Sequence, residues 1–285
     1  MSELPDIAAE PPKPTPAATL LRMAKRGIWS ARLAHIGLFC LAIAGFILSN
    51  TGESPIGMGL LFATAMAWVL LVGRTARDQA DLMRVPAWLG DGRFALAEGA
   101  ATRALSRFSI AGRPRVQSLH ALAVARFGLG RGEDARQLAD AALQYRQPKA
   151  AADTLRLLIA ETALAVNDLY AAHAALTGLV APLPLRESLK VLELQTDYCV
   201  RIGAWPHAGH DLPAKIEMAE LLPTEAAATV QAMLALATRR LGQPQWSAWL
   251  TNRVTLLTDT KKLVDRCPVL AELFPVPSPG TPGEG

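Results

Sequence analysis

The chain has few cysteines, and they are not arranged as a site. It contains three in 285 residues, Cys40, Cys199 and Cys267. They are far apart, odd in number and form no Cys-x-x-Cys pair, which argues against a disulfide framework and against a zinc knuckle. This usage fits a reducing compartment, with each cysteine acting as a small hydrophobic residue.

Motifs typical of active sites are also missing. The sequence has no Gly-rich phosphate loop opening a helix, no His-Glu-x-x-His, no nucleophile elbow and no carboxylate cluster at metal spacing. The nearest approach to a metal site is His207 and His210 with Asp211 beside them, and a solvated turn explains these residues more simply. We therefore predict a protein that is not an enzyme and binds neither a metal nor a cofactor.

Charge is absent from two long segments near the N-terminus. Residues 33–52 and 54–73 are each 20 residues long without a charged side chain, and only Glu53 separates them. About 20 apolar residues span the hydrocarbon core of a bilayer, so the pattern predicts a transmembrane hairpin over residues 31–73. Gly59, Ala63 and Ala67 recur every four positions in the second run, which favours close packing with the first helix or with another copy.

The charges that flank these runs predict an orientation. The turn between the runs has no Lys or Arg, whereas both outer flanks are basic. The flanking residues are Lys13, Arg22, Lys25, Arg26 and Arg32 before the first run, and Arg74, Arg77 and Arg84 after the second. The positive-inside rule then places both termini and the long C-terminal part in the cytoplasm. We expect an integral membrane protein with two spans.

The remainder is poor in aromatic residues and in alternating β-branched residues, which argues against strands. Apolar residues instead recur at helical spacing, as at Leu155, Leu158, Ile159 and Val166. The prediction is an all-α chain, a two-helix hairpin followed by a solenoid of about five helix pairs.

A helix-breaking residue recurs at a nearly constant period in this part. The markers are Gly92, Gly130, Asn167, Gly203 and Gly242, spaced 36 to 39 residues apart. A small residue follows each marker by five positions. These residues are Ala97, Ala135, Ala172, Ala208 and Ser247. A helix that folds back on its predecessor after a tight turn needs a small side chain where the two axes come closest, so the pattern predicts repeated helix pairs.

The segment from Leu119 to Pro148, LHALAVARFGLGRGEDARQLADAALQYRQP, resembles a tetratricopeptide repeat. It has the Leu-Ala pair, the turn glycine and the spaced small residues Ala135 and Ala142 before a closing proline. The resemblance extends over residues 75–258 and weakens in the last two units, where Lys215 and Val254 replace the second small residue. It implies a superhelix of helix pairs whose concave face binds a partner.

Carrying the groove positions of that family over from each marker gives a set of polar residues for the concave face. They are Gln117, His120, Thr154, Glu161, Lys190, Glu193, Asp197, Arg201, Arg239 and Arg240. Their mixed charge suits a protein or peptide segment. The simpler alternative is that they form the exposed stripe of amphipathic helices.

These features divide the chain into four parts. We expect a disordered basic tail over 1–30, the hairpin over 31–73, a tetratricopeptide-like domain over 74–274 and a disordered Pro/Gly-rich tail over 275–285. Residues 78–150 hold 11 basic and 7 acidic residues. Arg113, Arg115 and nearby residues form a loose basic cluster in this stretch, and without interleaved aromatics it favours a solvated or lipid-facing surface over nucleic-acid binding.

Two functions fit this organisation, and the sequence leaves the oligomeric state open. The first is a membrane-anchored scaffold that holds a protein partner at the cytoplasmic face of the bilayer. The second is a structural subunit of a larger membrane complex, in which the hairpin packs among other membrane helices. A hairpin followed by helical repeats also resembles, in architecture, the haem-biosynthesis-associated repeat proteins of the bacterial inner membrane.

Overall fold

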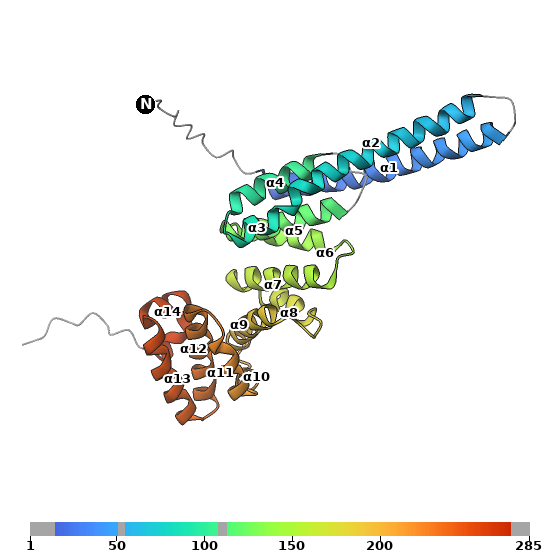
Figure 1. The fold of residues 1–285 in the computed structure, drawn as a ribbon. Helices are drawn as coiled ribbons and strands as arrows, with labels where there is room; N and C mark the ends of the chain where they lie inside the picture. Colours follow the sequence, from blue (N-terminus) through green and yellow to red (C-terminus); the bar gives the residue numbers. More distant parts are fainter. Residues whose placement is uncertain (1–14, 51–54, 108–112, 275–285) are drawn as a thin grey trace, which may run out of the picture. The chain divides into compact units, whose positions relative to one another are not determined.

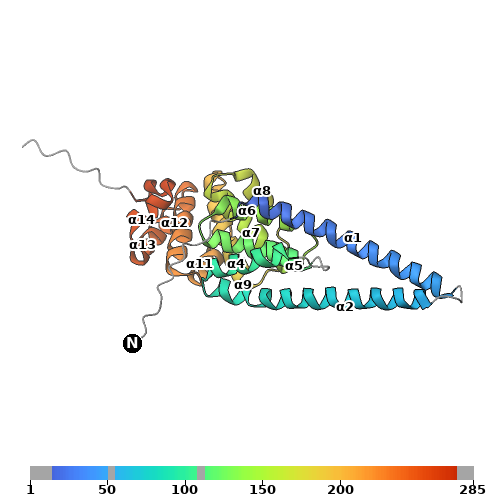
Figure 2. The same ribbon diagram turned by 90° about the horizontal axis from the view of Figure 1, so that it is seen from above.

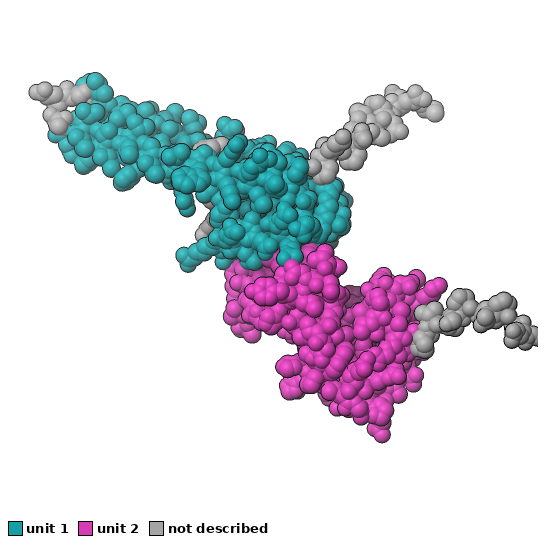
Figure 3. Space-filling view, turned by 180° about the vertical axis from the view of Figure 1, so that it is seen from behind, with its two compact units in different colours: residues 1–147 teal, residues 148–285 magenta. Residues whose placement is uncertain are grey.

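The computed structural model describes residues 15–50, 55–107 and 113–274, and every element in these ranges is a helix (Figure 1). The all-helical prediction is therefore confirmed for the described residues. Two compact units make up the chain, residues 1–147 and residues 148–285 (Figure 3). The predicted boundary at 73/74 does not separate these units, because the hairpin and the first helix pairs belong to the same one.

The first unit, unit 1, contains the hairpin and two helix pairs. Its helices are α1 (Ala17–Asn50), α2 (Pro55–Met83), α3 (Val85–Gly90), α4 (Phe94–Ser106), α5 (Arg113–Gly128) and α6 (Gly132–Leu143).

The second unit, unit 2, contains the remaining described helices. They are α7 (Lys149–Ala165), α8 (Leu169–Thr177), α9 (Leu185–Arg201), α10 (Trp205–Gly209), α11 (Leu212–Glu220), α12 (Thr224–Arg240), α13 (Pro244–Leu257), α14 (Thr260–Arg266) and the 3₁₀ helix η1 (Pro268–Glu272). Helix α12 is buried along most of its length and is the centre of this unit.

Helices α1 and α2 form a long hairpin (Figure 2). Both are long and apolar enough to cross a membrane, and most of their apolar residues are exposed on the surface of the hairpin. The two backbones meet near the turn, where a Cβ on Gly45 would lie 3.1 Å from the Leu61 side chain and a Cβ on Gly57 would lie 2.5 Å from the Ser49 nitrogen. Gly59 has no heavy atom within 4 Å of its Cβ position, so it is not where the two helices approach most closely.

The first half of α1 corrects the predicted N-terminal tail. Residues 17–30 are helical, so the prediction of disorder over 1–30 is wrong for them, while residues 1–14 lie outside the described part. Leu20 and Ala24 are fully buried and lie on one side of α1, which packs against α4 and α6. Burial of this face stabilises the helix where the Pro-rich composition nearby had suggested none.

The helix is interrupted beside Pro86, between the hairpin and the first pair. Helix α2 ends at Met83 and α3 begins at Val85, with Pro86 in the first turn of α3. A proline ring fixes φ and lacks an N–H, so it is tolerated at the start of a helix but interrupts a continuous one.

The five predicted markers share one backbone conformation. Their φ angles are +72° at Gly92, +76° at Gly130, +59° at Asn167, +71° at Gly203 and +72° at Gly242. At Gly130 the marker N–H donates to the Phe127 carbonyl and the next N–H to the Arg126 carbonyl, and the same two bonds occur at the other four markers. This is the Schellman motif, which closes a helix with one left-handed residue. The repeat period therefore reflects five equivalent helix ends.

The small residues predicted after each marker also lie where close packing requires them. Ala97, Ala135 and Ala172 are 0% exposed, Ala208 is 1% and Ser247 is 7% exposed. In the fourth pair the second helix is broken into α10 and α11 at Asp211, whose φ is +52°. Lys215 lies just beyond this break and its ammonium donates to the His207 and Ala208 carbonyls. The departure seen in the sequence at Lys215 thus coincides with an irregular helix.

Candidate functional site

Six of the predicted groove residues lie on two neighbouring helices of unit 2, α7 and α9. One of them is Thr154, whose hydroxyl donates to the Ala150 carbonyl of its own helix at 2.9 Å. The other five are charged, and we call them the α7–α9 strip. They are Glu161 on α7 and Lys190, Glu193, Asp197 and Arg201 on α9. These are the helices that precede the third and fourth markers, so they are the first helices of successive pairs. Their side chains are between 16% and 31% exposed, which leaves each of them reachable from solvent.

Lys190 is the centre of one half of the strip. Its Nζ donates to Glu161 Oε1 at 2.6 Å and to Glu193 Oε2 at 3.1 Å. Burial disfavours the ammonium, but the two carboxylates outweigh that effect and raise the pKa of Lys190. The ammonium therefore links α7 to α9 and remains charged at neutral pH.

Arg201 is the centre of the other half. Its Nε and Nη2 donate to the two Asp197 oxygens at 2.7 and 3.0 Å, and its Nη1 donates to the Leu164 carbonyl at 2.8 Å. The hydrogen bonds to Asp197 are the main cause of the raised pKa of Arg201. Because the Leu164 carbonyl belongs to the last turn of α7 and also accepts from the Asn167 N–H, Arg201 adds a second hydrogen bond at this helix end.

The other predicted groove residues lie elsewhere. Arg240 pairs with Glu272 at 2.6 Å, and Arg239 donates to the Glu272 carbonyl at 3.0 Å, so both hold the end of α12 to η1. Gln117 and His120 belong to α5 of unit 1. Gln117 is exposed, while His120 is mostly buried. In the described part of the chain its Nε2 has no hydrogen-bond partner, and burial lowers the pKa of its imidazole.

Two buried arginines on α5 were not singled out as a pair by the sequence. Arg115 is 1% exposed and Arg126 is 0% exposed. They are 11 residues apart, about three helical turns, and so lie on the same side of α5. Both reach α1, Arg126 at the Thr15 carbonyl just before the helix and Arg115 at Gly27.

Each of the three nitrogens of the Arg126 guanidinium has a hydrogen-bond acceptor. Nε donates to Glu98 Oε1 at 3.0 Å, Nη1 donates to Asp134 Oδ2 at 2.8 Å, and Nη2 donates to the Thr15 carbonyl. Arg131 adds a second cation on Glu98 at 3.2 Å. This network joins the start of α1 to three helices of the first two pairs.

Arg115 has no such partners. Its Nε, Nη1 and Nη2 atoms are buried and make no hydrogen bond with any of the residues that the structure describes. Its guanidinium covers the backbone of Gly27, where a Cβ would lie only 2.5 Å from Nε. Burial lowers the pKa of Arg115, yet a guanidinium stays charged at neutral pH, and an unpaired buried charge costs several kcal/mol.

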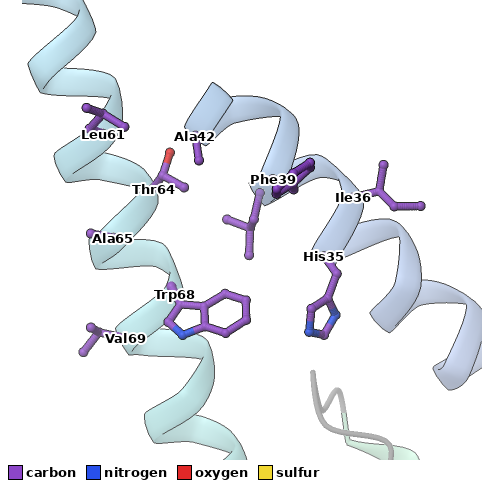
Figure 4. A pocket seen from close by; sticks show the side chains of 10 residues that line it. His35, Ile36, Phe39, Ala42, Leu61, Thr64, Ala65, Trp68 and Val69 are labelled. Atoms are coloured by element: carbon purple, nitrogen blue, oxygen red, sulfur yellow. The ribbon is translucent and has the colours of Figure 1, made fainter. Parts of the chain in front are cut away.

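An apolar cleft of about 740 Å³ lies between the two helices of the hairpin (Figure 4). It begins beyond the close contact of Gly45 with Leu61, on the side away from the turn. Its polar end is formed by His35 and Trp68, whose rings meet edge to face at 5.5 Å, and His35 Nδ1 is 2.8 Å from the Ala31 carbonyl. The remaining lining is apolar except for Thr64. The residues of the lining are His35, Ile36, Leu38, Phe39, Ala42, Leu61, Thr64, Ala65, Trp68 and Val69.

The histidines at the end of α10 do not form a larger cluster. His210 Nε2 lies 3.1 Å from Asp211 Oδ2, and both side chains are more than 70% exposed. No group of three His, Cys, Asp or Glu side chains at metal-binding distance occurs among residues 15–50, 55–107 and 113–274.

The cysteines differ in their surroundings. Cys267 is buried and Cys199 partly buried, and in both cases burial is the main cause of a raised thiol pKa. A raised pKa keeps the thiol protonated and poorly nucleophilic at neutral pH. Cys40 lies exposed on the apolar part of α1.

Comparison of this chain with protein-family models, with curated proteins and with solved structures finds no match. The function must therefore be argued from the α7–α9 strip, the arginines of α5 and the hairpin.

Proposed function

We propose that the chain is a membrane-anchored scaffold whose helical repeats bind a protein or peptide segment through the α7–α9 strip. The observation that carries this proposal is that five polar residues selected by repeat position lie together on the first helices of successive pairs. Their side chains hold one another in defined positions and remain partly exposed, so the strip presents a fixed pattern of charges to a ligand.

The five Schellman turns and the buried small residues support a tetratricopeptide-like arrangement of the pairs. In such an arrangement the first helices line the concave face, which is where the strip would lie. With three acidic and two basic side chains, the strip suits a segment of mixed charge with a slight basic excess. Hydrogen-bonded charges of this kind contribute specificity more than affinity.

The anchor in this proposal is the α1–α2 hairpin, inserted with both termini and the repeats on the cytoplasmic side. The basic residues that flank its two apolar stretches support this orientation. Three of them, Lys25, Arg26 and Arg32, are exposed on α1.

The test is a pull-down from native membranes after proximity labelling, using a charge-exchanged strip. The variant Glu161→Lys, Lys190→Glu, Glu193→Lys keeps both ion pairs of Lys190 but reverses the three charges of that half of the strip, while Asp197 and Arg201 stay unchanged. We expect the fold and membrane insertion to persist and one protein partner to be lost. A matched control exchanges the exposed pair Arg266 and Glu225, which lie 3.0 Å apart on the same unit. An unchanged partner set in the strip variant would show that these charges only hold α7 to α9.

A second function is favoured by the surface of the hairpin. Gly37, Gly59 and Gly73 have no heavy atom within 4 Å of their Cβ positions, and many large apolar side chains of α1 and α2 are exposed. A structural subunit would cover such a surface with helices of other chains. Extraction in mild detergent as a large particle of fixed stoichiometry, unaffected by the strip variant, would favour this function over the scaffold.

A further inference from the structure

Arg115 and the hairpin cleft lie along one face of α1. Gly27, which the Arg115 guanidinium covers, is followed by Ala31 and Leu38 at intervals of four and seven residues, and these positions share a face of a helix. Ala31 is 5% exposed, and its carbonyl lies 2.8 Å from His35 Nδ1. His35 and Leu38 line the cleft. Gly27 under the guanidinium and the cleft-lining residues His35 and Leu38 therefore share one face of α1, with the buried Ala31 between them.

The distance along α1 matches the layers of a bilayer. Gly27 precedes Leu33, the first residue of the uncharged run, by six residues, or about 9 Å of helix. A headgroup layer is about 5 to 8 Å thick on each side of the hydrocarbon core. With the hairpin inserted, Gly27 lies at the outer edge of the headgroup layer, where the Arg115 side chain can reach toward a lipid phosphate, and the cleft lies within the hydrocarbon of the same leaflet.

We propose that unit 1 binds one anionic phospholipid, with its phosphate on Arg115 and one acyl chain in the hairpin cleft. A guanidinium is suited to phosphate because its N–H groups match two phosphate oxygens at once. A cleft of about 740 Å³ is within the range that holds small ligands, and its almost entirely apolar lining suits a hydrocarbon chain. The proposal requires insertion of the hairpin but does not depend on partner binding by the α7–α9 strip.

The charges around this stretch of α1 favour an anionic lipid over a zwitterionic one. Lys25, Arg26 and Arg32 are exposed on other sides of the same helix. Basic residues close to the membrane surface concentrate anionic lipids around them. In the structure the guanidinium nitrogens are covered, so the phosphate reaches them when the Arg115 side chain turns toward the surface of α1. Because the guanidinium has no hydrogen-bond partner among the described residues, this movement breaks no hydrogen bond with them.

The proposal is tested with the full-length chain purified in mild detergent. Native mass spectrometry counts the phospholipids that remain bound, and thermal unfolding is followed while phosphatidylglycerol, phosphatidylcholine or inorganic phosphate is added. Arg115→Met removes the charge, Ala42→Phe fills the cleft, and Lys262→Met is the control, since Lys262 is exposed on unit 2. Resistance to alkaline extraction of the membranes checks that each variant is inserted.

We expect wild type and Lys262→Met to retain one phosphatidylglycerol per chain, and each of the other two variants to bind it at least tenfold more weakly. Phosphatidylcholine should bind more weakly than phosphatidylglycerol to the wild type. Equal stabilisation by inorganic phosphate alone would overturn the lipid site in favour of a free-anion site. Retention by Ala42→Phe would show that the cleft holds no acyl chain, and retention by Arg115→Met would remove Arg115 from the site. A dimer that fills the cleft of each copy, detected without lipid, would also overturn it.

Discussion

The two ends of α5 carry equally buried arginines in opposite electrostatic surroundings. Arg126 is held by Glu98, Asp134 and the Thr15 carbonyl, whereas the Arg115 guanidinium lies over the backbone of Gly27 and has no hydrogen bond to a described residue. The charge of Arg126 is therefore compensated by the protein itself, and that of Arg115 is not. Burial alone does not tell whether a charge stabilises a fold, because the cost of removing it from water is the same in both places.

The largest expected effect on stability comes from removing Arg126, the arginine whose charge the protein compensates. Arg126→Met leaves the carboxylates of Glu98 and Asp134 without the guanidinium and frees the start of α1. Removing one partner of a buried pair typically costs about 3 to 5 kcal/mol. Thermal or urea unfolding of the full chain, read on unit 1, should show a loss of this size. Arg131→Met, which removes only a partly exposed cation, should cost much less; equal losses would contradict the central role of Arg126.

Removing Arg115, whose charge the protein does not compensate, is expected to change the free energy of unfolding by a smaller amount and in the opposite direction. Arg115→Met removes an unpaired buried charge and keeps an apolar chain of similar length, so lipid-free protein should be more stable by roughly 1 kcal/mol. The measurement is the free energy of unfolding in detergent without phospholipid.

Gly27→Ala should be destabilising in the wild type, where its Cβ meets Arg115, and much less so alongside Arg115→Ala. Destabilisation by Arg115→Met as large as that by Arg126→Met would show that Arg115 has protein partners.

The smallest effect concerns His120, between the two arginines. Its pKa is lowered by burial, so at pH values below the ordinary histidine pKa of about 6.5 the unfolded chain binds a proton more readily than the folded one. The contribution of this residue to stability is therefore present at pH 7.5 and falls as the pH is lowered past that ordinary pKa. The difference in unfolding temperature between pH 7.5 and 5.5 should be smaller in His120→Leu than in the wild type. The same difference in both would assign the pH dependence to other groups.

The repeats could be predicted because the turns depend on local backbone geometry. A left-handed residue at a helix end is nearly always Gly or Asn, so the five markers were visible in the sequence, and the small residue five positions later follows from the approach of two helix axes. The pairing within the α7–α9 strip could not be predicted, since Glu161 and Lys190 meet only when two helices pack. The break at Asp211 was indicated only by Lys215, where an expected small residue was missing.

The helical class, the two apolar stretches and the positions of the turns follow from the amino-acid sequence, because they depend on composition and on residues close together in the chain. The helix over residues 17–30 and the difference between Arg126, whose charge has carboxylate partners, and Arg115, which has none among the described residues, emerge from the packing of the helices. A charged residue gives the same helical sequence pattern whether or not a carboxylate on another helix pairs with it. That contact depends on how α1, α4, α5 and α6 pack, and no local pattern records it.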